Sequence, residues 1–194
     1  MKKLVVIIAG TPGVGKTTVG RRVAKALDAE FIDVPELIRR GRLYEYYDRS
    51  LRTYVVDEKR LEEGVNEAIT ALGRGCVVVA SHIIPKIKPI HDVRVVVIRL
   101  NPLSLIKRLE RRGYPRRKII ANTEAEFIGV VYSEAVRLYG VDRVIQLDAT
   151  GLNPADTVSK VLKTLKGLEG DHIDWLSSLS EHDIEKLIRF LSKK

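Results

Sequence analysis

The sequence predicts an α/β fold in which a five-stranded parallel sheet is flanked by helices, with a helical extension at the C-terminus. Two observations support this prediction. First, short β-rich apolar runs alternate with longer segments of helical periodicity along most of the 194 residues, the order that builds a parallel sheet with right-handed crossovers. Second, a glycine-rich turn joins the first apolar run, residues 4–9, to a segment whose apolar residues recur at helical spacing: Val19, Val23, Ala26 and Leu27.

The glycine-rich turn has the spacing of a phosphate-binding P-loop. It reads Gly10-Thr-Pro-Gly-Val-Gly-Lys-Thr17 and fills every fixed position of the pattern G-x-x-x-x-G-K-[ST]. Because the turn follows a strand and opens a helix, its N–H groups and the helix dipole point at one anion. A chance match is the alternative, which this context disfavours. We therefore expect ATP phosphates at Lys16 and Mg²⁺ at Thr17.

The remaining elements follow in alternation. Strands are expected over residues 30–33, 76–80, 93–100 and 144–147. Helices are expected over residues 58–72, from Pro102, over 118–139 as one long helix, and from Asn153 to about 168. Residues 174–193 suggest a short amphipathic helix pair, either packed on the domain or serving as a partner-binding arm.

Residues 34–56 depart from this alternation, because they are charged and rich in tyrosine. We expect an insertion at the catalytic edge, where loops carry function. Its aromatic and cationic side chains suit a second substrate, with base stacking by tyrosines and monophosphate binding by arginines. The candidates are Tyr44, Tyr46, Tyr47, Tyr54, Arg39 and Arg52. Asp33 and Asp57 border the insertion and either orient a base or ribose or, as the more common role, cap helices.

Residues 108–118 crowd arginines around Gly113 and Pro115. Guanidinium groups on a loop that closes can neutralise a phosphoryl group in transfer and exclude water. A solvated basic helix end is the alternative. Arg108 and Arg112 are the preferred candidates, since their i, i+4 spacing places them on one face of a helix.

His82 follows the strand over residues 76–80 at its carboxyl end. This is the edge at which α/β sheets bind ligands. A histidine there can orient water or a phosphate, or carry a proton. A structural role in a loop is an equally weighted interpretation.

Composition limits the classes of protein to which the chain can belong. One cysteine, Cys76, provides neither a disulfide framework nor a cysteine metal cluster, and a reducing cytoplasm is the expected compartment. No apolar run is long enough to span a bilayer and no signal-peptide pattern is present, so no membrane association is expected. The net charge of +9 suits an anionic substrate or an acidic partner such as RNA, and a charged surface of thermophile type is the alternative.

Together these motifs resemble one group of proteins, the atypical adenylate kinases of the isoenzyme 6 type, which occur in archaea and in eukaryotic nuclei. The resemblance covers about residues 4–165 and leaves out the tail after about residue 168. It rests on the P-loop Gly10-Thr-Pro-Gly-Val-Gly-Lys-Thr-Thr18, on Leu43-Tyr44…Asp57-Glu58-x-Arg60, on Arg108-Leu-Glu-x-Arg112-Gly-Tyr114 and on Asn122-x-x-x-Glu126.

The resemblance implies a P-loop nucleoside monophosphate kinase fold and transfer of the ATP γ-phosphoryl group to AMP or another nucleoside monophosphate, with Mg²⁺ as cofactor and often a weak ATPase activity. It implies that Arg112 contacts ATP from a short lid, and that ATP is bound by Gly13, Val14, Gly15, Lys16, Thr17 and Thr18. The implied organisation is a kinase domain over 1–170 and a helical extension over 171–194. Within that domain lie core segments 1–32, 57–110 and 122–168, a monophosphate-binding insert at 33–56 and a lid at 111–121.

The resemblance further implies a role in small-ribosomal-subunit maturation, through a small-subunit ribosomal protein and pre-rRNA. A nucleotide-dependent assembly factor, working as an ATPase switch with little kinase activity, is therefore the competing hypothesis. The similar kinases often carry an aspartate two residues before the histidine that follows the third strand. Here that triplet is Ala80-Ser81-His82, so hydrolysis or transfer is expected to be weaker, with Mg²⁺ held by Thr17, phosphates and waters.

Overall fold

The computed structural model describes residues 2–73, 75–167 and 169–192, and its centre is a parallel sheet with the strand order β2-β5-β1-β6-β7. The predicted fold class and all five predicted strands are confirmed. Every neighbouring pair in this sheet is parallel. The strands are β1 (Leu4–Ala9), β2 (Glu30–Asp33), β5 (Cys76–Ala80), β6 (Asp92–Arg99) and β7 (Val144–Asp148).

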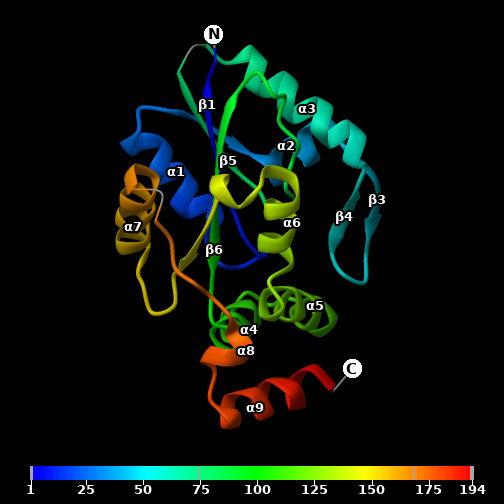
Figure 1. The fold of residues 1–194 in the computed structure, drawn as a ribbon. Coiled ribbons are helices and arrows are strands. Elements are labelled where there is room, and N and C mark those ends of the chain that lie inside the picture. Colours follow the sequence, from blue (N-terminus) through cyan, green and yellow to red (C-terminus); the bar gives the residue numbers. More distant parts are fainter. Residues whose placement is uncertain (1, 74, 168, 193–194) are drawn as a thin grey trace.

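Helices cover both faces of the sheet, and α1 and α7 lie on the opposite side from α3 and α6 (Figure 1). The strand β1 is buried on both faces because its side chains alternate between two cores. Val6 and Ile8 belong to the core that includes residues of α1 (Lys16–Ala26) and α7 (Pro154–Gly167). Val5 and Ile7 pack towards the other core, which includes residues of α2 (Val34–Gly41), α3 (Glu58–Ala71) and α6 (Val130–Tyr139).

The expected long helix over 118–139 is wrong, because it is broken into α5 (Arg116–Phe127) and α6. Gly129 lies at the break with a φ of 70°, a left-handed conformation that favours glycine. The guanidinium group of Arg99 is the physical reason for the break. Its Nη2 donates to the carbonyl oxygen of Glu126 at 2.6 Å, and a β-carbon on Gly129 would lie 3.3 Å from its Nη1.

The tyrosine-rich insertion is a helix followed by a hairpin. Its two strands, β3 (Tyr44–Asp48) and β4 (Thr53–Val56), pair antiparallel apart from the main sheet. The capping interpretation of its two bordering aspartates is confirmed. Asp33 accepts from the backbone N–H of Glu36 at the start of α2, and Asp57 accepts from that of Arg60 at the start of α3.

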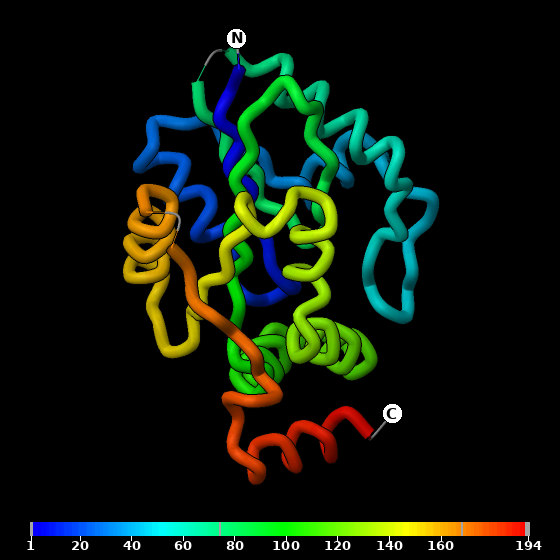
Figure 2. The backbone as a smooth tube through the Cα atoms, in the orientation of Figure 1, coloured from blue at the N-terminus to red at the C-terminus, as the bar shows by residue number. Residues whose placement is uncertain are grey.

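The arginine-rich segment contains little loop. The helix α4 (Pro102–Arg111) begins after the cap residue Asn101 and is joined to α5 by residues 112–115 alone. The expected lid, 111–121, therefore corresponds to the last residue of α4, this short connection and the first turns of α5. The two helices contact each other and lie together near the lower end of the molecule in Figure 2.

The predicted helix pair at the C-terminus is confirmed as α8 (Trp175–Ser178) and α9 (Glu181–Ser192). The tail first runs beside β7, where the backbone N–H of Asp171 donates to the carbonyl oxygen of Gln146 at 3.0 Å. It then crosses to the lower end of the sheet in Figure 1, so that α9 lies against α4 and α5. Because Leu187 of α9 is fully buried, the tail packs on the domain. Residue 193, the end of the expected helix pair, lies outside the described residues.

Candidate nucleotide-binding site

The P-loop connects β1 to α1 in the conformation that its glycines permit. Gly10, Gly13 and Gly15 all have positive φ angles, of 138°, 101° and 113°. At Gly13 a side chain is also excluded by packing, because a β-carbon there would lie 2.6 Å from Leu109 Cδ2 of α4. The loop is therefore held tightly against α4 on one side, while Thr17, in the first turn of α1, remains exposed.

Lys16 is buried beneath the loop with its charge poorly solvated. Its Nζ donates to the carbonyl oxygen of Thr11 at 3.0 Å. Burial lowers the pKa of Lys16 to about 7, although the carboxylates of Glu126 and Asp33 act in the opposite direction, and the charge of Arg112 lowers it further. An anion bound in the loop would stabilise the ammonium form, since opposite charge within a few ångströms favours the charged state.

A cleft of about 840 Å³ opens beside the P-loop. The P-loop forms one wall, the insertion forms the second, and α5 with its preceding connection forms the third. The cleft is large enough for more than the phosphates of one nucleotide, since ligand pockets of roughly 300–1,000 Å³ enclose whole drug-sized molecules. Its polar lining includes Lys16, Thr17, Thr18, His82, Arg112, Lys118 and Asn122.

The insertion contributes an aromatic wall. Tyr44, Tyr47 and Tyr54 line the cleft, with ring centroids 4.4 Å apart for Tyr44 and Tyr54 and 5.0 Å apart for Tyr47 and Tyr54. Arg52 also lines it, at the hairpin tip, where its carbonyl oxygen accepts from Lys118 Nζ at 3.0 Å. Two of the insertion's candidates, Tyr46 and Arg39, are exposed and are not among the lining residues.

The two preferred arginines do not point to the same place: Arg108 lies in α4, and Arg112 is the residue that follows it. Arg112 lines the cleft, and its charge contributes to the low pKa of Lys16. Arg108 is absent from the lining. Its Nη1 instead donates to the carbonyl oxygen of Val14 at 3.0 Å, with a longer contact of 3.4 Å to that of Gly13. Arg108 therefore supports the P-loop backbone in this structure, and Arg112 faces the space where a ligand would lie.

His82 lines the cleft just beyond the end of β5. Burial lowers its pKa to about 3, and the charges of Lys16 and Lys118 contribute in the same direction. The imidazole is therefore neutral at physiological pH, and it can orient a water or a phosphate through one N–H and one acceptor nitrogen. It is a poor proton carrier near pH 7, since an effective acid or base titrates near the working pH.

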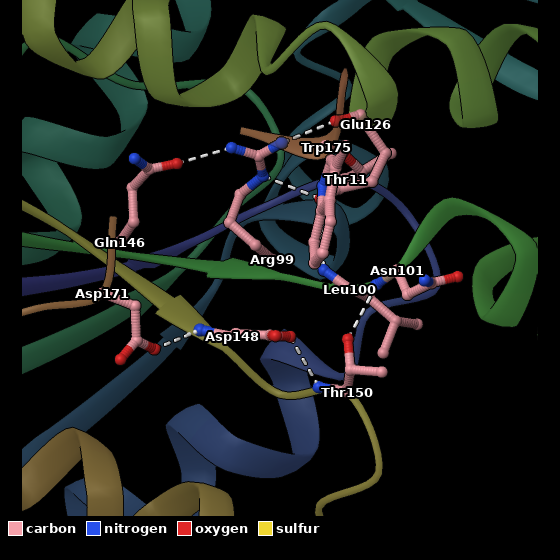
Figure 3. A network of polar contacts seen from close by, with 10 residues as sticks. All are labelled: Thr11, Arg99, Leu100, Asn101, Glu126, Gln146, Asp148, Thr150, Asp171 and Trp175. Carbon is pink, nitrogen blue, oxygen red and sulfur yellow. Dashed lines mark hydrogen bonds and ion pairs between the residues drawn. The ribbon is translucent and has the colours of Figure 1, made fainter. Parts of the chain in front are cut away.

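A buried carboxylate, Glu126, connects the P-loop to the rest of the molecule (Figure 3). Its Oε2 accepts from Thr11 Oγ1 at 2.6 Å. Its Oε1 accepts from Arg99 Nε at 2.7 Å, from the backbone N–H of Leu100 and from Trp175 Nε1, the last two at 3.1 Å. Arg99 in turn donates to Gln146 Oε1 at 2.5 Å. One carboxylate thus joins the nucleotide loop, the end of β6 and the C-terminal extension.

The sequence alone assigned no role to Glu126 or Asn122. The pattern that could have indicated one is their i, i+4 spacing, which places both side chains on one face of α5. Asn122 lines the cleft, and its Nδ2 is buried without a hydrogen-bond acceptor among the described residues. Because an unsatisfied buried donor costs about 1–3 kcal/mol, a ligand oxygen at this position would stabilise the site.

A metal ion in this cleft would need ligands from outside the protein. Within the described ranges, no group of three or more His, Cys, Asp or Glu side chains could hold one. The exposed hydroxyl of Thr17 fits Mg²⁺, which prefers oxygen and keeps several waters while binding substrate phosphates.

Across the described residues, no helix has both the length and the apolar character to cross a membrane.

Comparison with known proteins agrees with this geometry. Residues 6–129 match a protein family described as "AAA domain". Proteins named "Putative adenylate kinase" are similar over nearly the full length. The one from Saccharolobus solfataricus is 30% identical over 97% of both chains, and the one from Thermococcus onnurineus is 31% identical over 97% of both.

Solved structures share the fold at low sequence identity. A gluconokinase from Sinorhizobium meliloti superposes with a TM-score of 0.55 and 20% identity, covering 86% of this chain and 93% of its own. A shikimate kinase from Aquifex aeolicus gives a TM-score of 0.52 at 15% identity, covering 85% and 97%. The sheet and its helices are thus those of small P-loop kinases.

Proposed function

The chain belongs to the AAA-domain family of P-loop proteins together with the archaeal adenylate kinase homologues, and from this membership we propose that it is a nucleoside monophosphate kinase. It transfers the γ-phosphoryl group of ATP to AMP or another nucleoside monophosphate. The bond between the γ-phosphorus and the β,γ-bridging oxygen breaks, and a bond forms between that phosphorus and a phosphate oxygen of the acceptor. Two nucleoside diphosphates result.

The observation that carries this proposal is the shape of the cleft. The P-loop and the tyrosine-lined hairpin face one continuous space of about 840 Å³. ATP phosphates held by residues 13–18 and a monophosphate base stacked on Tyr44 or Tyr54 would meet between these walls. Holding two reactants in this way supplies most of the catalysis in phosphoryl transfer, together with electrostatic stabilisation.

Three cations surround the expected position of the transferring group. Lys16 lies in the P-loop, Arg112 follows α4, and Lys118 lies in the first turn of α5. Charge builds up on the equatorial phosphoryl oxygens during transfer, so cations fixed in place stabilise the transition state. Arg108 acts through the loop by holding the carbonyl oxygens of Gly13 and Val14, and is therefore a positioning residue.

Mg²⁺ is the metal that this chemistry requires, and the Thr17 hydroxyl would hold it together with phosphate oxygens. When bound, the ion neutralises charge on the β- and γ-phosphates. His82 remains neutral and orients a water or a phosphate oxygen. Asn122 Nδ2 donates to a ligand oxygen.

The chain has one cysteine, Cys76, which fits a reducing compartment. We therefore place the reaction in the cytoplasm.

A product assay with a panel of acceptors tests the proposal. The protein is supplied with ATP and Mg²⁺, with AMP, CMP, UMP or no acceptor, and ADP is measured by a coupled reaction. We expect a monophosphate, foremost AMP, to increase ADP formation many-fold above the rate with water. Lys16→Ala should abolish turnover, whereas Lys25→Ala, at the exposed end of the same helix, should not. Equal ADP formation with and without every acceptor would contradict the kinase.

A second candidate function is favoured by the net charge of +9. We propose, from this charge and from the resemblance to isoenzyme 6, that the protein also acts in small-ribosomal-subunit maturation, through a ribosomal protein and pre-rRNA. Co-sedimentation with small ribosomal subunits at rising salt tests this role. Binding that depends on nucleotide and weakens with salt supports it, since phosphate contacts release counterions. No co-sedimentation at low salt would contradict it.

A further inference from the structure

The register of the sheet places an acidic side chain beside Ala80. Asp33, the last residue of β2, is paired with Ala80, the last residue of β5. Paired residues on neighbouring strands point to the same face of a sheet. A carboxylate missing at Ala80 is therefore present one strand away, at the same edge and on the same face.

That face is the one covered by α1. A β-carbon on Gly20 of α1 would lie 3.0 Å from Phe31 Cε2 and 3.4 Å from Ala80 Cβ. Phe31 precedes Asp33 by two residues, so both side chains lie on the α1 side of β2. Asp33 is the nearer of the two to the carboxyl edge of the sheet, where α1 begins.

Thr17 lies at this edge, because it precedes Gly20 by three residues, which is about one turn of helix. Asp33 therefore ends its strand at the same edge of the sheet, and on the same side, as the helix turn that carries Thr17.

The capping bond leaves part of this carboxylate available. Oδ1 of Asp33 accepts from the N–H of Glu36 at 3.4 Å, whereas Asp57 makes the equivalent bond to Arg60 at 3.0 Å. Among the described residues, Oδ2 of Asp33 has no hydrogen-bond donor. Asp33 is half-buried, and a carboxylate oxygen without a donor is a good acceptor for metal-bound water.

We propose that Asp33 is the metal-site carboxylate of this chain and takes the place of the acid that Ala80 lacks. It accepts hydrogen bonds from waters of the Mg²⁺ that Thr17 and the ATP phosphates hold. This inference rests on the proposed function for the presence of Mg·ATP, but not on AMP as the acceptor. Retained waters are characteristic of Mg²⁺ sites, so the carboxylate need not touch the metal.

Mn²⁺ binding, followed by electron paramagnetic resonance of the free ion, tests this proposal without turnover. The titration is made in the presence of a non-hydrolysable ATP analogue. We expect Asp33→Asn to weaken Mn²⁺ binding about tenfold, the lower end of the effect of removing a group that hydrogen-bonds metal ligands. Asparagine retains the helix cap. Asp57→Asn, the same change at the start of α3, is the matched control and should leave Mn²⁺ binding unchanged.

Moving the carboxylate from position 33 to position 80 tests whether an acid at either position can serve the metal site. The double variant Asp33→Asn with Ala80→Asp should recover most of the lost Mn²⁺ affinity. Binding of the analogue in the presence of EDTA should be the same in the wild type and in D33N. Unchanged Mn²⁺ affinity in D33N, an equal loss in EDTA, or a double variant no better than D33N would overturn the proposal. Failure of AMP to stimulate turnover leaves these titrations unaffected, so the two proposals fail separately.

Discussion

Glu126 accepts a hydrogen bond from Thr11 Oγ1 at 2.6 Å, so a carboxylate that is 1% exposed holds the first residues of the P-loop. The same carboxylate pairs with Arg99 and accepts from Trp175. Both partners of the ion pair are almost fully buried. In such a pair each charge depends on the other, because an unpaired buried charge is strongly destabilising.

Removing this charge is therefore expected to destabilise the whole fold. Glu126→Gln should lower the free energy of unfolding by about 3 kcal/mol or more, the usual cost of breaking a buried pair. Urea denaturation measures this change. Glu185→Gln removes an exposed carboxylate that pairs with Arg189 at 3.6 Å and should change stability by less than about 1 kcal/mol. If the urea denaturation curves of E126Q and the wild type had equal midpoints and slopes, the buried charge of Glu126 would not be stabilising the fold.

The low pKa of Lys16 predicts that nucleotide binding takes up a proton. In the free protein the pKa is lowered from 10.5 to about 7, so above pH 7 much of the population has a neutral lysine. Bound phosphates raise that pKa, and the complex then holds more protons than the free protein. Affinity for ATP should therefore fall as the pH rises above about 7. Calorimetry in buffers of different ionisation enthalpy should detect proton uptake at pH 8.

The control for this measurement is Lys16→Arg, since arginine stays protonated. Any binding that this variant retains should show no proton uptake at pH 8. Lys16 is not the group that takes up the proton if the wild type shows no proton uptake at pH 8, or if the arginine variant shows the same uptake.

His82 should not titrate between pH 5 and 8. Its pKa is lowered from 6.5 to about 3 by burial and by the charges of Lys16 and Lys118. Between these two pH values the imidazole is protonated in the unfolded chain and neutral in the folded protein. Stability is therefore unaffected by this group above about pH 6.5 and falls as the pH decreases towards 3. His82→Asn should reduce this acid slope. Histidine NMR spectra of both proteins would identify the His82 signals, and movement of those signals near pH 6.5 would contradict the prediction.

The two arginines should give different defects. Arg112→Ala is expected to lower kcat by about 100-fold, the scale for one lost group that stabilises transition-state charge, with the melting temperature unchanged. Arg108→Ala should lower the melting temperature and raise KM for ATP, because it frees two P-loop carbonyl oxygens. Arg111→Ala, an exposed residue of α4, is the control. Identical effects of R108A and R112A would contradict this division of roles.

The sheet and most helices could be predicted because their signals are local. The apolar run of β1 is buried on both faces, and Asp57 caps α3 through its own neighbours in the chain. The break at Gly129 could not be predicted, since it involves the side chain of Arg99, which comes from strand β6, 30 residues away in sequence. Periodicity alone favours a continuous helix there, and a long-range contact overrides it.

The site shows the same limit. A motif predicted the P-loop because its residues are consecutive, but the i, i+4 spacing of Arg108 and Arg112 did not reveal that only Arg112 reaches the cleft. The i, i+4 spacing of Asn122 and Glu126 indicates a shared helix face but does not identify the hydrogen-bond partners of Glu126. Its partners are 115, 27 and 49 residues away in sequence, so only the folded chain brings them together.

The central claim is transfer of a phosphoryl group between two nucleotides, and the stoichiometry of the reaction tests it most directly. Chromatography of a reaction with equal ATP and AMP should show two ADP formed for each ATP and each AMP consumed, without inorganic phosphate. The same mixture with Lys16→Ala should show no change. The account would be contradicted if one inorganic phosphate were released for each ATP consumed while AMP stayed intact, and if CMP or UMP in place of AMP gave the same result.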